Sequence, residues 1–243
     1  MEPAKWPILK NAPIKEAIID LQVKGIEEFS LERLPTSISG FPNRSEILDQ
    51  TIDFTHKGND FSASQRSSFI GVRFDSDDQS KVIQFRRDGF TFSMLPPYSE
   101  WKEMREMAQN YWRQYTQCLK PKKVVRIATR YINLLTLPSP VVHFEEYLTS
   151  PPSVPEGLPN RMSSFLTRTV LHDTEHGLSL ILTQALKKAT DREAPITLDF
   201  DVFKKVSLDA ESEEVWKILD HCRVLKNRAF FQSLTKTTLE MFK

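Results

Sequence analysis

The stretch VVRIATRYINLLTL, residues 124–137, decides how this chain is divided. Its β-branched residues and its alternation of apolar with polar positions are typical of a long strand. It comes shortly after Pro121, which ends a helix predicted over residues 99–119. From residue 122 onward the order of predicted elements starts again. The sequence therefore predicts one structural unit that occurs twice along the chain.

The first unit begins with a strand. Residues 16–24 alternate between apolar and polar side chains, as a strand with one wet face does. Residues 26–39 can form a short helix that Pro35 interrupts, and a further strand is predicted at residues 47–55.

A hairpin signal and a long amphipathic helix complete the first unit. Residues 68–95 contain apolar runs on either side of Asp88-Gly89, a dipeptide typical of tight hairpins, and so predict an antiparallel meander. Ser99 can cap the helix that follows. The apolar residues of this helix recur every three or four positions and form one stripe, made of Trp101, Met104, Ala108, Tyr111, Trp112, Tyr115 and Leu119.

The second unit repeats this order. A short helical stretch near residues 144–148 and a Pro-rich link at residues 151–159 precede three predicted strands, at residues 164–172, 177–186 and 195–203. A second amphipathic helix follows, with acidic residues at its start and Asn227 as its C-terminal cap. The inward-facing residues of this helix are Val215, Trp216, Leu219, Cys222 and Leu225.

We therefore expect an α+β fold built on an antiparallel sheet, with two fused repeats at residues 10–121 and 122–243. Two half-sheets joined edge to edge, with both helices on the concave side, would bury both apolar stripes. This arrangement is like the saddle of TATA-box-binding proteins. The alternative is one continuous helix-grip sheet that resembles START-type lipid-binding proteins.

The composition excludes several classes of function. The 243 residues include 33 Lys and Arg against 32 Asp and Glu, and the formal net charge of +1 gives no overall attraction to nucleic acid or to an anionic membrane. The seven glycines are too far apart for a P-loop, a dinucleotide-binding G-x-G-x-x-G or a G-x-S-x-G elbow. No stretch has the apolar length of a signal peptide or a membrane helix, so we expect a soluble, cytoplasmic protein.

The two cysteines, Cys118 and Cys222, each fall inside an apolar helical pattern. Two thiols are too few for a Cys-rich zinc site or a disulfide framework. We expect both to be buried, free thiols in a reducing compartment. Nothing in the sequence implies a cofactor or a metal ion.

Five segments carry a family resemblance: NAPIKEAIIDL from Asn11, QFRRDGFTFSMLPPYSEW from Gln84, RYINLL from Arg130, DFDVF from Asp199 and KNRAFFQSLT from Lys226. Together they resemble a sporadically distributed family of uncharacterised prokaryotic proteins of similar length. The resemblance spans nearly the whole chain and implies no assigned activity, so it supplies no catalytic or binding residue. A patchy distribution implies genes that move between genomes, as defence, toxin–antitoxin and mobile-element genes do.

Arginines on the predicted strands form the main candidate site. Arg126 and Arg130 lie four residues apart on one strand and so project from the same face. A guanidinium presents a planar fork to oxyanions, which makes phosphate or a nucleotide a candidate ligand. The alternative, which we favour because the net charge is near zero, is that the arginines pair with acidic residues, among them Asp20 and Glu16. The candidate ligand-binding residues are Arg86, Arg126, Arg130, Arg168, Asp199 and Asp201.

Two carboxylates and two imidazoles are candidate metal ligands. Asp199 and Asp201 share one strand face, about 7 Å apart, and could hold a divalent cation or act as acid and base. A solvated face of a half-buried sheet is the commoner setting for such a pair. His172 and His176 flank a predicted turn, and a polar hairpin tip explains them more simply than a metal site does.

Aromatic residues are abundant around the first helix. Their spacing matches a core stripe better than a platform for stacking nucleic-acid bases. Phe230 and Phe231 follow the predicted end of the second helix. They either plug the second half-sheet or form a homodimer contact.

Two functions from different classes remain, and neither follows from a catalytic motif. We favour a non-catalytic binding or regulatory module that recognises a protein or nucleic-acid partner with the convex face or central groove of its sheet. The alternative is a small-molecule or nucleotide pocket, or a hydrolase, with Arg126, Arg130, Asp199 and Asp201 as its polar centre. A structural subunit of a larger assembly is a third possibility, and it would leave a large apolar patch on the isolated chain.

Overall fold

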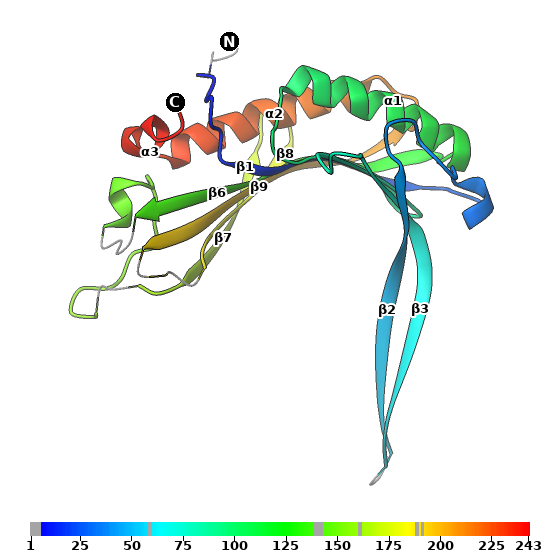
Figure 1. Cartoon of the computed structure of the whole chain (residues 1–243), viewed down its shortest axis with the longest axis horizontal. Coiled ribbons are helices and arrows are strands. Elements are labelled where there is room, and N and C mark those ends of the chain that lie inside the picture. The colour runs from blue at the N-terminus through cyan, green and yellow to red at the C-terminus, as the bar shows by residue number, and fades with distance from the viewer. Residues whose placement is uncertain (1–5, 58–59, 139–142, 160–161, 188–189, 191) are drawn as a thin grey trace.

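The computed structural model describes most of the chain: residues 6–57, 60–138, 143–159, 162–187, 190 and 192–243. Side chains are described outside residues 52–64. The described residues form a nine-stranded antiparallel sheet with two long helices on one face (Figure 1). The expected α+β class and antiparallel sheet are confirmed. No helix in the described part of the chain combines the length and the apolar character that crossing a membrane requires.

The first half of the chain supplies five strands and a long helix: β1 (Ile14–Lys24), β2 (Asn43–Lys57), β3 (Asp60–Asp75), β4 (Lys81–Arg86), β5 (Gly89–Met94) and α1 (Trp101–Leu119). The helix expected over residues 26–39 is reduced to one 3₁₀ turn, η1 (Leu31–Arg33), because a residue before proline disfavours helical backbone and Pro35 follows directly. The strand expected at residues 47–55 is part of the longer β2.

The second half supplies four strands and the remaining helices: β6 (Lys123–Pro138), η2 (Phe144–Glu146), β7 (Phe165–Asp173), β8 (Leu178–Leu186), β9 (Glu193–Asp209), α2 (Glu214–Ser233) and α3 (Lys236–Glu240). The cap expected at Asn227 is wrong. Helix α2 continues for almost two further turns because its buried stripe continues through Lys226 and Phe230.

The strand order across the sheet is β2-β3-β4-β5-β1-β6-β9-β8-β7. Strands β1 and β6, each the first strand of its half, pair antiparallel in the middle of the sheet. Outward from β1 the chain order is β5, β4, β3, and outward from β6 it is β9, β8, β7. The strands of both halves therefore belong to one continuous sheet.

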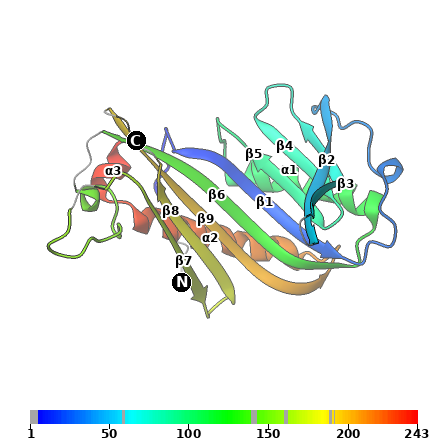
Figure 2. The same ribbon diagram turned by 90° about the horizontal axis from the view of Figure 1, so that it is seen from below.

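The two long helices lie side by side on one face of this sheet. Helix α1 packs on β5, and α2 packs on β6, β8 and β9. All seven residues of the apolar stripe predicted for α1 are buried. Ser99 is not its cap, because the helix begins after Glu100 and no side chain caps it. Figure 2, seen from below, looks onto the opposite face, called here the bare face, with both helices behind the strands.

Two hydrogen bonds join the helical layer to distant parts of the chain. The indole N–H of Trp112 in α1 donates to the backbone carbonyl of Ala210 at 3.0 Å, and that of Trp101 donates to Asp220 of α2 at 2.9 Å. Tyr115 stacks on Trp112 with ring centroids 5.2 Å apart. Each fully buried ring of this kind contributes about 2–3 kcal/mol through the apolar surface removed from water. The helices thus hold the two halves together over one face.

The bend of the sheet differs from the expectation. Figure 1 shows the ends of the sheet turned away from the helices, so α1 and α2 lie on the outer side of the bend and not on the concave side. One cause is a bulge in β3, where Gly71 pairs with Ile47 but Phe69 pairs with Leu48. An extra residue bends the bulged strand. Beyond it, residues 48–57 and 60–69 pair only with each other and form a two-stranded arm on the bare-face side (Figure 1).

Candidate functional site

The candidate residues of β6 and β9 lie on the bare face. Along β9, Asp199 and Asp201 point away from the helices, while Phe200 between them is fully buried beneath α2. Arg126 and Arg130 of β6 reach these two aspartates across the same face. The prediction that each pair shares one face is confirmed.

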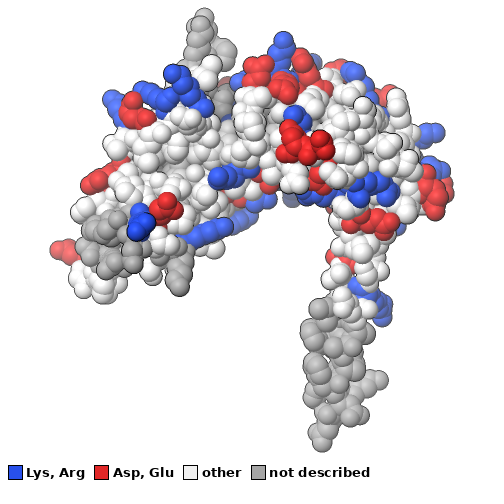
Figure 3. Space-filling model, viewed as in Figure 1, with Lys and Arg blue, Asp and Glu red and all other residues white. Residues whose placement is uncertain are grey.

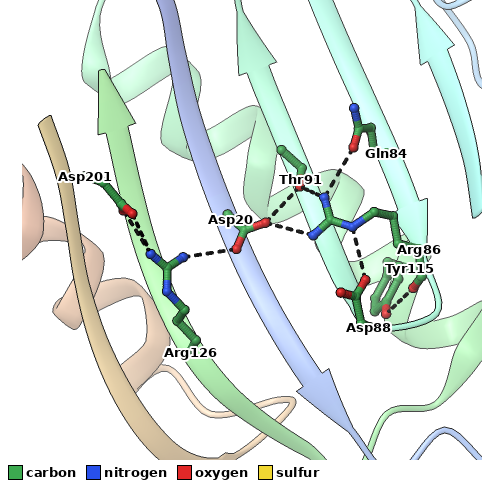
Figure 4. Close-up of polar contacts among 8 residues, drawn as sticks. All are labelled: Asp20, Gln84, Arg86, Asp88, Thr91, Tyr115, Arg126 and Asp201. Atoms are coloured by element: carbon green, nitrogen blue, oxygen red, sulfur yellow. Dashed lines mark hydrogen bonds and ion pairs between the residues drawn. The ribbon is translucent and has the colours of Figure 1, made fainter. Parts of the chain in front are cut away.

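Asp20 of β1 joins the two halves of the site. One of its carboxylate oxygens accepts a hydrogen bond from Nη2 of Arg86 on β4 at 2.9 Å, and the other accepts one from Nη1 of Arg126 on β6 at 3.3 Å (Figure 4). The side chain of Asp20 is 18% exposed. A half-buried carboxylate between two guanidiniums is well placed to hold the central strands together.

Arg86 is bound on all sides of its guanidinium. Besides Asp20, it donates to Asp88 at 3.1 Å, to the hydroxyl of Thr91 at 2.6 Å and to the side-chain carbonyl of Gln84 at 3.2 Å (Figure 4). Burial acts to lower the pKa of Arg86, but the charges of Asp20 and Asp88 raise it above its ordinary value. Arg86 is therefore a fixed cation of the sheet.

Two glycines flank Arg86 on the neighbouring strands. Gly71 and Gly89 are both paired with Arg86 in the sheet register. A Cβ added to Gly71 would lie 2.4 Å from the carbonyl oxygen of Phe85, and one added to Gly89 would lie 2.4 Å from that of Leu21. Since both contacts are with backbone, a larger residue would force the strands apart. Glycine therefore lets β3 approach β4 closely at Phe85 and Arg86, and lets β5 approach β1 closely at Leu21.

Arg126 forms a close ion pair with Asp201. Its Nη2 donates to both carboxylate oxygens of Asp201, at 2.9 and 2.8 Å, and its guanidinium lies 4.5 Å from the ring centroid of Phe203. Burial raises the pKa of the Asp201 carboxyl, although Arg126 and Arg130 act in the opposite direction. The pair is thus held in a partly dehydrated place, which strengthens its hydrogen bonds.

Arg130 and Asp199 form a second two-pronged pair. Nε of Arg130 donates to both carboxylate oxygens of Asp199, at 2.9 and 3.1 Å, and Nη2 donates to one of them at 2.5 Å. The hydrogen bonds that Arg130 donates to Asp199 raise the pKa of Arg130. Asp20 links the ion pairs of Arg86 and Arg126, and the Arg130–Asp199 pair is separate from them. We call all these ion pairs together the Arg–Asp network; its members are Asp20, Arg86, Asp88, Arg126, Arg130, Asp199 and Asp201.

Arg168 lies outside this network. It is exposed on β7 and faces Thr183 of β8, which in turn faces Asp199 of β9. Two strand spacings separate it from Asp199, about 10 Å. Within the described ranges the Arg168 side chain makes no ion pair or hydrogen bond. Five of the six predicted site residues therefore come together and the sixth does not.

The network has little free capacity for an added ion. Its three arginines face four aspartates, and each guanidinium already spans one or two carboxylates. A phosphate would have to displace an aspartate from a two-pronged pair, and a divalent cation would have to displace an arginine. Asp20, Asp199 and Asp201 thus pair with arginines, as the alternative to a ligand-binding site expects. Glu16 forms no ion pair with these arginines in the described part of the chain.

The two histidines at the β7–β8 turn do not converge. Nδ1 of His172 lies 3.1 Å from the hydroxyl of Ser179, whereas Nδ1 of His176 lies 3.2 Å from Asp173. Among the described residues, Asp173, Glu175 and His176 bring one ligand atom each to within 4.8 Å of one another. These groups lie at the tip of the hairpin and already bond to one another and to the turn backbone.

Both cysteines are free thiols. Cys222 is buried, as expected, and burial raises its pKa to about 12. Cys118 is only half-buried, so the expectation of full burial is wrong for it, because it lies at the margin of the α1 stripe. Burial raises the pKa of Cys118 as well. Both side chains are protonated thiols at neutral pH and poor nucleophiles.

One buried charged residue was missed from the sequence. Lys226 of α2 lies four residues after Cys222 and four before Phe230, on the buried stripe of the helix. This four-residue spacing could have shown that Lys226 lies on the buried stripe. The helix was predicted to end at Asn227, so the stripe was not followed to Phe230. Phe230 packs on Phe200 of β9 with ring centroids 6.1 Å apart, as the suggested plug of the second half-sheet would.

No protein-family model matches this chain, and no curated protein matches it.

Proposed function

We propose that the chain is a non-catalytic binding module that recognises a protein partner with the bare face of its sheet. The observation that carries the proposal is the unequal covering of the sheet. Helices α1 and α2 pack on one face, whereas the other face of the same strands carries the Arg–Asp network and no helix from the described part of the chain (Figure 2). A rigid surface whose charges are already paired needs no rearrangement before it docks, which lowers the cost of binding.

The charge pattern favours a protein over a nucleic acid. A nucleic-acid backbone is bound by Lys and Arg side chains that are free to replace its counterions. The arginines of the network are each held by an aspartate, so a phosphate approaching them also meets carboxylates. Figure 3 shows basic and acidic side chains intermingled on the visible surface, without one dominant sign.

Exposed apolar side chains on the bare face also favour a protein partner. Leu166 is 73% exposed and Val170 is 43% exposed, both on the edge strand β7. Val170 faces Ile181 of β8, which faces Asp201 of β9, so this apolar patch borders the network. Apolar groups beside satisfied polar groups are the composition of a protein–protein interface.

We also infer that the two halves are copies of one unit that together form a saddle. The support is topological: each half begins with a central strand, continues through a 3₁₀ turn and a set of antiparallel strands, and ends with a long helix on the same face. Strand β2 has no counterpart in the second half. In such a saddle the partner would sit on the inner side of the bend, between the arm and β7.

A pair of valines tests the proposed docking face. Val170 lies on the bare face, and Val224, 38% exposed on α2, lies on the helical side. A photo-crosslinking residue placed at either position in the full chain, expressed in its own host, should capture a protein from position 170 and not from position 224. Val170→Asp should then weaken binding of the purified partner by about tenfold or more, and Val224→Asp should leave it unchanged.

Three results would overturn the proposal. They are the same captured protein from both positions, no captured protein from position 170, or an adduct at position 170 that nuclease removes. The last result would assign the bare face to a nucleic acid instead.

A further inference from the structure

A cavity of about 500 Å³ lies at the opposite side of the sheet from the network. Its walls are the segment before β1 (residues 6–14), the connection between β5 and α1 (residues 96–101), the middle of β6 and the last turns of α2. This volume is in the range of small-molecule pockets. Four of the five segments that carry the family resemblance contribute to the walls.

The cavity contains a buried cation without a counter-charge. Lys226 is only 9% exposed, and its ammonium nitrogen lies 3.7 Å from the ring centroid of Tyr131. In the part of the chain that the structure describes, this nitrogen has no hydrogen-bond acceptor and no carboxylate partner. A contact with an aromatic face offsets only part of the hydration that a buried ammonium loses.

The other charged groups around the cavity add to the positive charge. Arg223 lies one turn before Lys226 on α2, with its guanidinium 5.9 Å from the ring centroid of Trp101, and Lys10 lies at the rim. Glu100 is the one carboxylate among the described lining residues. With Lys226 protonated the lining therefore carries two more positive than negative charges, which suits an anion.

The remaining walls are aromatic and carry hydroxyl groups. Tyr98 and Tyr131 place their hydroxyl oxygens 3.0 Å apart, and burial raises the pKa of both, so both remain hydrogen-bond donors at neutral pH. Trp101 and Phe230 also line the cavity, and the stacked pair Trp6–Phe231 closes one side with centroids 5.1 Å apart. Flat rings of this kind pack well against a flat apolar ligand.

We propose that this cavity binds a small organic carboxylate with an aromatic body, whose carboxylate pairs with Lys226 and Arg223. The ring of the ligand would lie among Trp101, Tyr131 and Phe230. The pairing supplies the counter-charge that Lys226 lacks, and the hydrogen bonds that Lys226 and Arg223 donate to the carboxylate are charge-assisted.

Uptake of a proton on binding would distinguish a ligand that pairs with Lys226 from one that only fits the shape of the cavity. Burial, and then Arg223, lower the pKa of Lys226 to about 7, so above that pH the free protein holds Lys226 mostly as the neutral amine. A bound carboxylate favours the ammonium and must bring about one proton with it at pH 8.5. Affinity should fall about tenfold per pH unit above pH 7. The phenols of Tyr98 and Tyr131 stay protonated in this range, and the other charged groups that line the cavity are Arg223, Lys10 and Glu100.

The experiment compares charged with uncharged probes on the full chain. Benzoate and indole-3-acetate, with benzamide and indole-3-acetamide as their neutral partners, are titrated by calorimetry at pH 6.5 and 8.5 in buffers of different ionisation enthalpy. We expect at least one carboxylate to bind about tenfold or more tightly than its amide, with proton uptake at pH 8.5. Lys226→Met should weaken that carboxylate by about tenfold or more and abolish the uptake. Lys217→Met, which removes an exposed charge from the same helix, should change neither.

A second measurement keeps the test open if Lys226→Met does not fold. In the wild-type chain with isotope-labelled lysine side chains, the NMR titration of Lys226 should move to higher pH when the carboxylate is added. The proposal fails if neither carboxylate binds, if the amide binds as tightly, if binding occurs without proton uptake, or if the titration of Lys226 does not move.

Discussion

Buried positive charge is paired with carboxylates on one side of the sheet and lacks a carboxylate partner on the other, among the described residues. On the bare face Arg86, Arg126 and Arg130 each contact one or two aspartates at hydrogen-bond distance. On the helical side Lys226 is more deeply buried and contacts an aromatic ring. A cation whose partners come from its own chain supports the fold, whereas a cation that lacks a partner is a cost to the fold that a ligand can relieve. The Arg–Asp network is therefore a structural cluster, and the cavity around Lys226 is a candidate ligand site. The arginine and aspartate patterns nevertheless made the network easier to find in the sequence.

The largest effect is expected from breaking the bridge at the centre of the network. Asp20→Asn keeps the shape of the side chain but leaves Arg86 and Arg126 with less than their full counter-charge. We expect the free energy of unfolding to fall by about 3 kcal/mol, because removing one partner of a buried ion pair strands the other. Urea denaturation measures this change. Glu27→Gln, which removes an exposed partner of Lys122, is the control and should leave the free energy of unfolding almost unchanged.

The opposite sign is expected at Lys226. Because its folded-state pKa is about 7 and its ordinary value is 10.5, the unfolded chain binds more protons between these values and the wild-type stability rises with pH across that window. Lys226→Met removes a buried charge and should raise the free energy of unfolding by about 2 kcal/mol at pH 7. The gain should shrink as the pH approaches 10.

Thermal unfolding of Lys226→Met and wild type at pH 7, 8 and 9.5 checks this window. Lys217→Met is the reference, since its side chain is exposed and its effect should not depend on pH. A gap between Lys226→Met and wild type that is constant with pH, or a less stable variant at pH 7, would contradict the assignment of Lys226 as an unpaired cation.

The smallest effects are expected from substitutions of two arginines of the bare face, Arg130 and Arg168. Arg130→Gln should lower the free energy of unfolding by about 1 kcal/mol, because it leaves the largely buried Asp199 without its two-pronged partner. Arg168→Gln should change it by less than about 0.5 kcal/mol, because the side chain is exposed on the edge strand. Equal costs for both variants in urea denaturation would show that the pairs of the network carry no stability.

The helices and strands were predictable where one physical period dominates. The apolar stripe of α1 recurs without interruption and every predicted residue of it is buried. Period-two alternation placed Asp199 and Asp201 on one face, and the structure agrees. The arm of β2 and β3 was underestimated because its residues are largely polar, and a strand paired on one side only does not need an apolar face to form its hydrogen bonds.

The partners within the site were not predictable in the same way. Which carboxylate meets Arg126 depends on the register of β1, β6 and β9, which are far apart in the sequence. Register is set by long-range pairing and bulges and not by local pattern. The direction of the bend was also wrong, since curvature depends on twist and on the bulge near Gly71. Lys226 was missed because the helix was predicted to end at Asn227, so its buried stripe was not followed through to Phe230.

The central pairing of β1 with β6 also affects how the chain can be made. Strand β1 ends at Lys24, but its inner neighbour does not begin until Lys123, so a growing polypeptide leaves the ribosome with the inner edge of β1 unpaired. At a synthesis rate of about 5–20 residues per second, the 98 residues between Lys24 and Lys123 delay the partner by roughly 5–20 s. During that interval the first half offers the same backbone hydrogen bonds to a neighbouring nascent chain. Expression in polysomes, where such chains crowd together, is therefore the setting in which this protein is most prone to exchange halves between copies.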